Sequence, residues 1–307
     1  MKKIIKVFII IFILATPLFA IPALDITDVG VSAESIAVGG THGTSYTANS
    51  IFTNPALLNP ELLWSVDGFR TNTLEDVIIH NLSGFMTIKD KPIAFGYMGT
   101  SIDDIPMTKK TNKIIVKDGR YRYSLATYYA GFQHQLTSSL STGISAKITK
   151  MSLFNFGAKG FNTDIAMAWI KPYYHFSVVL QNALWFQNLN YNNGVKEKFP
   201  FNVITNISRK YQFKEMLTQT HFQFQYRYGQ VLLYGVGTQF QMKHIPYLEA
   251  LIGYRTRPHL AKTIGRYSVG FNLQLKGIKL SYAYEKSQTP IYDNIHYVSL
   301  HLFKLKR

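Results

Sequence analysis

The chain has 307 residues, of which 47% are hydrophobic, so it can form one large domain or two small ones. It has no cysteine, which excludes disulfides and lipidation at an N-terminal cysteine. Charged residues make up only 16%, whereas Tyr and Phe number 20 and 21, which indicates that part of the surface lies outside water. The net charge of +16 comes from singly scattered residues, which favours anionic lipid headgroups or lipopolysaccharide over nucleic acid as a partner.

Residues 1–20 have the pattern of a signal peptide. Lys2, Lys3 and Lys6 precede an apolar stretch over residues 7–19, and Ala20 stands before the expected cleavage site. The alternative is an uncleaved anchor helix, but the apolar stretch is shorter than the ~20 residues that a spanning helix needs. We therefore predict export, with the bacterial outer membrane as the destination.

Residues 21–61 show no periodicity. They are rich in small residues, and forty residues without periodicity should be either disordered or packed against something. A barrel of fourteen strands has a lumen too wide for its own side chains to fill. We therefore predict that this segment is a plug inside a barrel, buried through a few apolar anchors: Ile36, Val38, Ile51, Phe52, Leu57 and Leu58.

Residues 62–307 are predicted to form an all-β, antiparallel transmembrane β-barrel of about 14 strands. The clearest alternation lies near the end of the chain, where Phe271 belongs to an apolar list and Asn272 to a polar one. Each candidate strand has about the ~9–11 residues that a tilted membrane strand requires. The predicted strands are 63–71, 82–89, 93–101, 120–136, 140–151, 161–170, 173–181, 201–210, 218–228, 230–242, 247–255, 266–275, 278–285 and 296–305.

Short connections alternate with long ones along this region. The short turns are 89–92, 137–139, 171–172, 243–246 and 276–277, and the long polar loops are 102–119, 182–200, 256–265 and 286–295. Outer-membrane barrels place short turns at one end and long loops at the other. The alternative is a soluble β-sandwich. Against it, the polar positions carry Gly, Ser, Ala, Asn and Gln rather than Lys and Glu, and aromatic residues cluster at strand ends.

The stretch "SIAVGGTHGTSYTANSIFTNPALLNP", residues 35–60, resembles the N-terminal signature of the PorV/PorQ family, relatives of the FadL-type hydrocarbon transporters. The matching residues are the pair Gly39 and Gly40 and the motif Asn54, Pro55 and Ala56. The segments "LLYGVGTQFQM", "LEALIGYRT", "RYSVGFNLQL", "IKLSYAYEK" and "YVSLHLFKL" also follow the family's order and spacing. The resemblance implies an outer-membrane barrel with a plug.

Three departures from the family concern the ligand or partner more than the fold. Residues 45–48 are Ser, Tyr, Thr and Ala where the family often has acidic residues, and Leu57 stands where it often has Gly. The chain also runs past Phe303 to Arg307, whereas the family's barrels usually end on an aromatic residue.

The polar positions of the alternating strands predict which charged side chains line the lumen. We expect them to form salt bridges that hold the plug, or a basic conduit that attracts an anionic head group. The predicted lumen-facing residues are Arg122, Lys147, Asp164, His175, His221, Arg227, Glu249, Arg255, Arg266 and Lys279.

We expect no enzyme, no cofactor and no metal site. The nine histidines show no two-ligand spacing with carboxylates, and Ser299 and His301 share a face of the last strand without an acid to orient them. Two functions remain open. One is a passive FadL-like channel for hydrophobic or amphipathic molecules. The other, implied by the resemblance to PorV, is a non-transporting barrel that binds proteins of a type IX-like secretion system. Either would meet outer-membrane lipid and the barrel assembly machinery.

Overall fold

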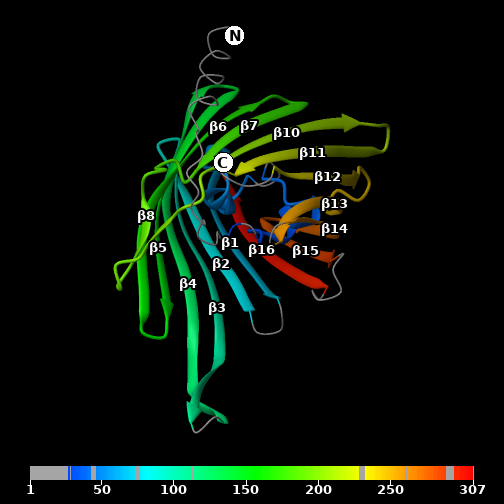
Figure 1. The fold of residues 1–307 in the computed structure, drawn as a ribbon. Helices are drawn as coiled ribbons and strands as arrows, with labels where there is room; N and C mark the ends of the chain where they lie inside the picture. The colour runs from blue at the N-terminus through cyan, green and yellow to red at the C-terminus, as the bar shows by residue number, and fades with distance from the viewer. Residues whose placement is uncertain are drawn as a thin grey trace.

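The computed structural model describes residues 27, 29–42, 46–73, 77–111, 114–227, 232–259, 262–287 and 294–306, so the predicted signal peptide lies outside the described residues. No helix in these ranges has the length and apolar character needed to cross a membrane. Fourteen strands form a closed antiparallel barrel, as predicted (Figure 1). They are β1 (Leu62–Thr73), β2 (Val77–Ile88), β3 (Lys91–Thr111), β4 (Ile114–Thr137), β5 (Leu140–Leu153), β6 (Phe156–Ile170), β7 (Tyr174–Gln181), β10 (Asn202–Gln212), β11 (Met216–Arg227), β12 (Leu233–Met242), β13 (Leu248–His259), β14 (Lys262–Leu275), β15 (Ile278–Ser287) and β16 (Ile295–Leu305).

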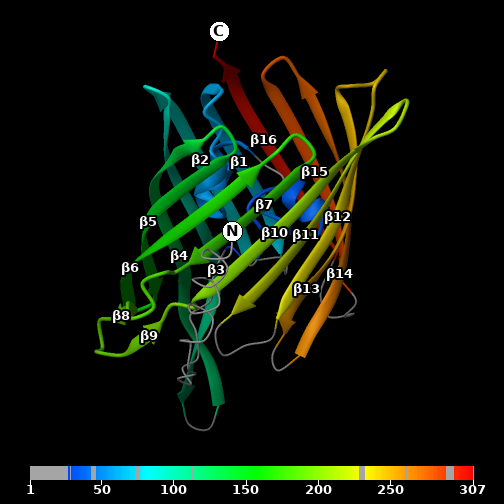
Figure 2. The same cartoon turned by 90° about the horizontal axis from the view of Figure 1, so that it is seen from above.

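Barrel strands pair with their neighbours in chain order, and the first strand pairs with the last. β1 and β16 are joined from Leu62↔Leu305 to Thr71↔Tyr297, which closes the ring. Closure leaves no open sheet edge, which is what a sheet needs in order to sit in lipid. The turns predicted to be short lie at the end of the barrel that also holds the C-terminus, and the long connection from β7 to β10 lies at the other end (Figure 2).

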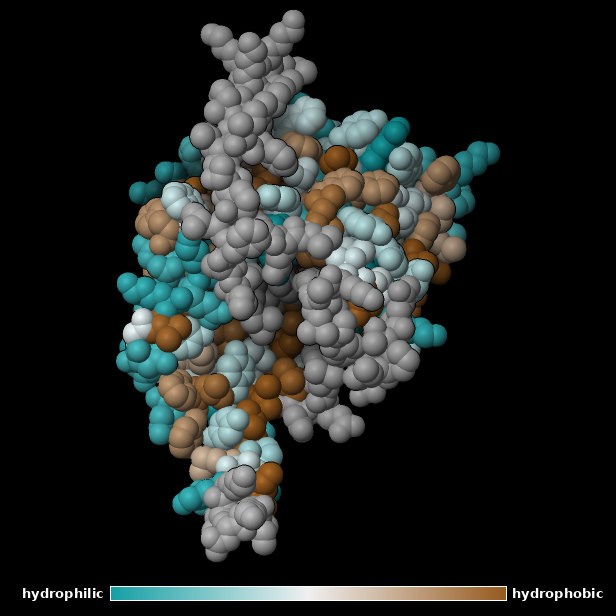
Figure 3. Space-filling view, viewed as in Figure 1, coloured by the Kyte–Doolittle hydropathy of each residue, from teal (hydrophilic) through white to brown (hydrophobic). Residues whose placement is uncertain are grey.

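The apolar and polar positions of the period-two alternation lie on opposite sides of the barrel wall. Phe271 is 41% exposed on the outside, whereas its neighbour Asn272 is 1% exposed on the lumen side. In β1, Asp67 is fully buried on the lumen side and follows the same alternation. Hydrophobic and hydrophilic residues are interspersed over the face of the molecule seen in Figure 3.

Strand β4 faces the opposite way from our prediction. Arg122 is exposed on the outer side, where it forms an ion pair of 2.7 Å with Asp103, instead of facing the lumen. Leu125 and Tyr129 of the same strand are buried on the lumen side. The expected order of apolar outside and polar inside fails here because the lumen beside β4 is itself apolar. Phe52 of the N-terminal segment, for example, lies edge-on to Tyr129 at 5.1 Å between ring centroids.

The predicted loops 102–119 and 256–265 are wrong, since most of each is strand. β13 and β14 stay paired as far as His259↔Lys262. β3 and β4 stay paired as far as Thr111↔Ile114, with two irregularities in register on the way. This hairpin reaches beyond the rest of the wall (Figures 1 and 2). Its branched residues, Ile115 and Val116 among them, favour extended backbone even where they are exposed, which explains why the polar composition misled the prediction.

The predicted loop 182–200 contains a small hairpin of its own. It consists of β8 (Asn188–Tyr191) and β9 (Lys196–Lys198). β8 does not join the ring but pairs with the outer end of β6 through Ala158↔Tyr191 and Lys159↔Asn190. The hairpin therefore covers the wall next to the short strand β7.

Residues 29–42 and 46–61, which we call the plug, lie inside the ring of strands (Figure 1). The plug holds one short helix, α2 (Ala33–Ala37), and two 3₁₀ turns, η2 (Ala48–Phe52) and η3 (Pro55–Leu57). Ser32 caps α2 by accepting a hydrogen bond from the Ser35 amide, and Asn54 caps η3 by accepting one from the Ala56 amide. Almost all plug residues from Val31 to Leu58 that the structure describes are buried.

Candidate functional site: the plugged lumen and its side cavity

The Gly-Gly pair of the sequence motif lies directly against the barrel wall. Gly39 and Gly40 have φ angles of +75° and +69°, which favour glycine. The wall opposite is also glycine: a Cβ added to Gly253 would lie 2.1 Å from the Gly39 nitrogen, and one added to Gly237 would lie 2.3 Å from the Val38 oxygen. Plug backbone and wall backbone are therefore in direct contact on the β12–β13 side.

The Asn-Pro-Ala motif makes a second backbone contact, on β5. Ser141 donates its hydroxyl to the Ala56 carbonyl oxygen at 2.8 Å. A Cβ added to Gly143 would lie 2.3 Å from the carbonyl carbon of Pro55. Both halves of the sequence motif thus position the plug by close approach to wall positions that carry small residues.

Charged side chains hold the plug between these contacts. Glu34 of α2 is 2% exposed and accepts an ion pair of 2.6 Å from Lys279. Asn272 donates to Glu34 at 3.2 Å and to Glu249 at 2.7 Å. Lys279 and Asn272 therefore both meet a single plug carboxylate, and Asn272 also binds Glu249 of the wall.

A second anchor joins the plug to β1 and β16. The Asp67 carboxylate accepts a hydrogen bond of 2.6 Å from the Asn49 amide and lies 2.8 Å from Nδ1 of His301. Ser299 accepts a hydrogen bond of 2.7 Å from the Ala33 amide. Although Asp67 supplies the acid that the sequence reading did not find beside His301, all three wall residues are at most 1% exposed and hold the plug. We see no access for a substrate to them.

A buried arginine cluster lies on the lumen side of β13 to β15. Glu285 is fully buried and binds Arg255 at 2.5 Å and Arg266 at 3.0 Å, with Arg257 at 3.7 Å. Arg255 also donates to the Val29 carbonyl oxygen of the plug at 3.1 Å, and Arg257 donates to the same oxygen. The cluster contains three arginines for one glutamate, and two of these arginines bind the first residues of the plug.

The structure places most of the predicted lumen residues on the lumen face but does not bring them into one site. They fall into three separate groups: Lys147 with Asp164, the arginine cluster, and Lys279 with Glu249, which are linked through Glu34 and Asn272. Arg227 donates to Asn202 at 2.9 Å, His221 is buried in the wall, and His175 contacts Tyr46 of the plug. Arg122 alone lies outside.

Sequence reasoning missed Glu285, Glu34 and Asp67. Glu285 stands on the polar side of the alternation in β15, so period two could have identified it. Glu34 lies in a segment without periodicity, and no sequence signal separates it from a solvated residue. The described residues contain no group of three His, Asp or Glu arranged to hold a metal ion.

A cavity of about 70 Å³ lies in the lumen between β4, β5 and the β8–β9 hairpin. Its lining is largely apolar, with threonines, the Lys147 ammonium and the Glu197 carboxylate among it. Thr127 and Thr149 are hydrogen-bonded to each other at 3.0 Å, and Tyr191 donates to Glu197 at 2.6 Å. The apolar lining residues are Tyr123, Leu125, Tyr129, Met151, Leu189 and Phe199.

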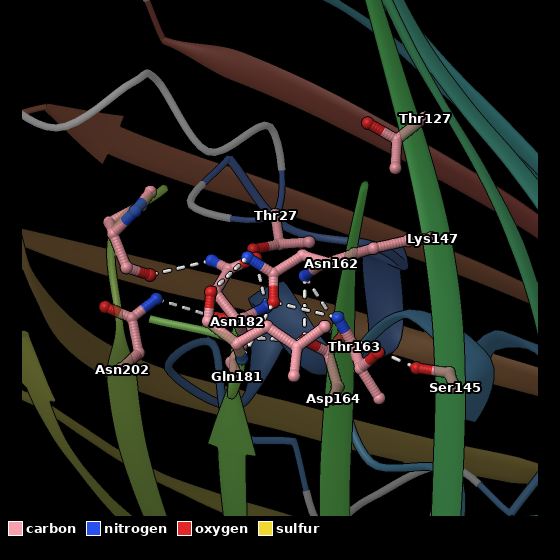
Figure 4. A network of polar contacts seen from close by, with 12 residues as sticks. Thr27, Thr127, Ser145, Lys147, Asn162, Thr163, Asp164, Gln181, Asn182 and Asn202 are labelled. Atoms are coloured by element: carbon pink, nitrogen blue, oxygen red, sulfur yellow. Dashed lines mark hydrogen bonds and ion pairs between the residues drawn. The ribbon is translucent and has the colours of Figure 1, made fainter. Parts of the chain in front are cut away.

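Polar side chains next to this cavity hold together a break in the barrel wall (Figure 4). β6 pairs with β7 only from Ile165 to Ile170, and with β8 only at Ala158 and Lys159. Between these stretches Asn162 replaces a strand partner: it accepts from the Leu184 amide at 3.1 Å and donates to the Leu184 carbonyl at 3.3 Å. The wall here depends on these side chains and on one backbone hydrogen bond, from the Ala183 amide to the Thr163 carbonyl at 2.7 Å, instead of a continuous ladder.

Asp164 and Asn182 complete the closure of the break. Asp164 binds Lys147 at 2.8 Å and accepts from the Asn182 amide at 2.7 Å. Asn182, with φ of +56°, turns the chain out of β7 and donates to the Pro200 carbonyl at 2.7 Å. The network thus fixes the point at which the hairpin leaves the barrel.

Outside the wall, at the level of the cavity, lies a groove of about 600 Å³. Met151 and Tyr191 line both the groove and the cavity. Met151 and Tyr191 are each paired with Ala158 of β6, so the paired strands β5, β6 and β8 separate the lumen cavity from the outer groove at this row.

No protein-family model matches the sequence, and no curated protein matches it either. Solved structures match over nearly its whole length. The Pseudomonas putida toluene transporter TodX is 12% identical, with a TM-score of 0.60 over 94% of this chain and 100% of that chain. The monoaromatic hydrocarbon channel CymD is 11% identical, with a TM-score of 0.59 over 93% and 99%. A Pseudomonas aeruginosa FadL homologue is 8% identical, with a TM-score of 0.56 over 93% and 99%. The chain therefore has the fold of these FadL-type barrels.

Proposed function

We propose that the protein is an outer-membrane channel for uncharged, hydrophobic small molecules, which leave the lumen sideways through the wall. The observation that carries this proposal is the largely apolar cavity beside the break between β6 and β7, where Met151 and Tyr191 line both the cavity and the outer groove. The similarity to TodX and CymD supports it, since those structures are described as a toluene transporter and a monoaromatic hydrocarbon channel.

The axial route through the barrel is closed by the plug. Ile51 and Phe52 are fully buried and fill the space beside Gly96 and Gly131, where an added Cβ would meet them at 2.5 to 2.7 Å. A solute that enters the cavity from outside therefore has a shorter way out through the wall than along the axis. A hydrophobic solute gains by that exit, because it passes directly into lipid.

The charges around the cavity favour an uncharged cargo. Lys147, the one cationic residue of the lining, is already paired with Asp164 at 2.8 Å. Glu197 adds a carboxylate to the same lining. An anionic head group would meet no free cation here, which argues against the basic conduit considered from the sequence.

The size of the cavity points to small cargo and to movement of the lining. Its volume of about 70 Å³ is about half of the ~150 Å³ cavity that binds benzene in a model protein. Met151 is the residue best suited to yield, because methionine side chains are unbranched and adapt their shape. We infer that a monoaromatic-sized molecule displaces Met151 on entry.

Filling the cavity tests this function. Thr149→Phe places a ring in the cavity, and Ile148→Phe, one residue along β5, places the same ring on the lipid side as a matched control. The measurement is uptake of radiolabelled toluene by intact Gram-negative cells that express each variant, because lipopolysaccharide is the barrier in such cells. We expect Thr149→Phe to reduce uptake to the level of cells without the protein and Ile148→Phe to leave it unchanged.

Membrane fractionation and migration of unheated samples on a denaturing gel establish that each variant is assembled in the outer membrane. Equal uptake by wild type and an assembled Thr149→Phe variant would refute a route through the cavity. Absence of uptake by the wild type would refute the channel itself.

A non-transporting barrel of a type IX-like secretion system is the second candidate. It is supported by the resemblance of the Gly-Gly and Asn-Pro-Ala segments to PorV and by the tightly held plug, which a binding barrel would not need to move. Under this alternative, deletion of the gene would stop secretion of proteins with a sorting domain and leave toluene uptake unchanged.

A further inference from the structure

Two lysines face each other on the outside of the barrel. Lys150 of β5 and Lys159 of β6 are directly opposite in the antiparallel register, and both are exposed. Like charges in directly opposed positions destabilise a sheet. The structure records no ion pair of either ammonium with a carboxylate of the described residues; Lys150 lies over the Tyr128 ring at 5.6 Å. The pair thus holds two positive charges together without an anion.

The height of the pair on the barrel matches a membrane interface. Trp169 is 46% exposed near the short-turn end of β6. Lys159 lies ten residues earlier in the chain, near the other end of the same strand. At ~3.3 Å per residue and a tilt of ~35–45°, this spacing corresponds to about 25 Å, the height of the apolar band of such barrels. The pair therefore lies at the outer-leaflet interface, where the phosphates of membrane lipids are found.

The surroundings have room for a lipid head group. The groove of about 600 Å³ includes both lysines, and small residues form its floor: Ser124, Ala126, Ser152 and Gly157. One row nearer the middle of the barrel, Tyr128, Ile148 and Phe161 are 43% to 49% exposed and offer an apolar surface for acyl chains. The outer surface thus offers cations and open space for a phosphorylated head group. Toward the middle of the barrel it then offers apolar side chains for the acyl chains of the same lipid.

We propose that the groove around Lys150 and Lys159 binds a phosphate of an outer-leaflet glycolipid of the lipid A type. The two ammonium groups hold the phosphate, and the Tyr128, Ile148 and Phe161 surface receives the acyl chains. This proposal rests on the outer-membrane location in the proposed function. It adds that the outlet of the side route, next to Met151 and Tyr191, is bordered by a bound lipid.

The test compares phosphorylated with dephosphorylated lipid. Native mass spectrometry of the detergent-purified barrel measures binding of lipid A with two phosphates and of the same lipid with its phosphates removed. The variant is Lys150→Gln/Lys159→Gln. The matched control is Lys171→Gln/Lys243→Gln, which removes the same charge from exposed short turns at the opposite end. We expect the variant to bind the phosphorylated lipid about tenfold or more weakly, as for two basic residues lost near a membrane surface, and the control to bind as the wild type does.

Three outcomes would overturn the proposal: equal weakening in variant and control, undiminished binding by the variant, or equally tight binding of the dephosphorylated lipid by the wild type. Lys150→Arg/Lys159→Arg guards against a folding defect, because it keeps both charges and should retain binding. Failure of the proposed function is distinguishable, since it would appear as loss of the outer-membrane fraction or of toluene uptake, neither of which this binding measurement reads.

Discussion

The β12–β13 side of the lumen and the outer end of the β4–β5 side differ in what fills the space next to the wall. On the β12–β13 side, Gly39 lies against Gly253 and Gly237 lies against Val38, backbone to backbone. On the β4–β5 side, toward the outer end, Tyr123, Leu125 and Met151 face the β8–β9 hairpin and leave a cavity. The first side is filled by the main chain of the plug. On the second side, the side chains of the wall and of the hairpin do not meet, and a cavity remains.

This difference shows that the width of the barrel does not by itself determine where its lumen contains free space. Glycine in the wall lets the plug approach until main chains touch, whereas the large wall residues near the outer end face side chains of the β8–β9 hairpin across a cavity. Residue size along a strand thus decides where a solute can reside.

Removing the plug abolishes the difference between the two sides of the lumen and has the largest expected effect. Deletion of residues 26–58 takes away both the close-packed contacts and the apolar anchors Ile51 and Phe52. We expect an assembled barrel whose ion conductance in planar bilayers is far above that of the parent, because a lumen of this width then fills with water. An assembled, truncated barrel of unchanged conductance would mean that the plug does not close the channel.

Removing one ion-pair partner sharpens the role of the anchors. Lys279→Met leaves the Glu34 carboxylate, 2% exposed, without its cation, so we expect plug docking to weaken by about 3 kcal/mol. Glu34→Gln should cost about 1 kcal/mol, because it leaves the less buried Lys279 near Glu249 and keeps an acceptor. Hydrogen exchange of plug peptides measures both. Equal protection in the two variants would show that the pair does not hold the plug.

A larger residue on the close-packed side tests the backbone contact. Gly253→Val places a side chain where even a Cβ lies 2.1 Å from the Gly39 nitrogen, so we expect faster plug exchange and a loss of about 2–3 kcal/mol. Gly68→Val is the control: no atom lies within 4 Å of its added Cβ, and it should change stability by less than about 0.5 kcal/mol. Similar effects at both sites would contradict the close packing.

The smallest effect is expected on the open side. Thr149→Phe loses the 3.0 Å hydrogen bond to Thr127 but buries an aromatic ring in existing space, so stability should change by less than about 1 kcal/mol. Urea unfolding of the barrel in micelles measures the change. A loss as large as that of Gly253→Val would show that this side has no more room than the other, and the comparison would fail.

Period-two alternation was enough to predict the barrel from the sequence, because a strand in a closed sheet must present lipid on one side. All fourteen predicted strands are present, and Phe271 and Asn272 lie on the sides that their types require. In the structure, the Gly-Gly pair and the Asn-Pro-Ala motif are the parts of the plug whose backbone approaches the wall most closely. Local composition carries this information, since close approach needs small residues wherever the contact occurs.

Only the tertiary structure decided which strands depart from the rule and where space remains. Arg122 faces outward because the plug makes the lumen beside β4 apolar, a fact that lies in a distant segment of the chain. Lys147 and Asp164 were both identified from the sequence, but their pairing at 2.8 Å follows from the register of β5 with β6. Their pairing leaves the cavity without a free cation, because neutralisation depends on distance between side chains and not on their presence in the chain.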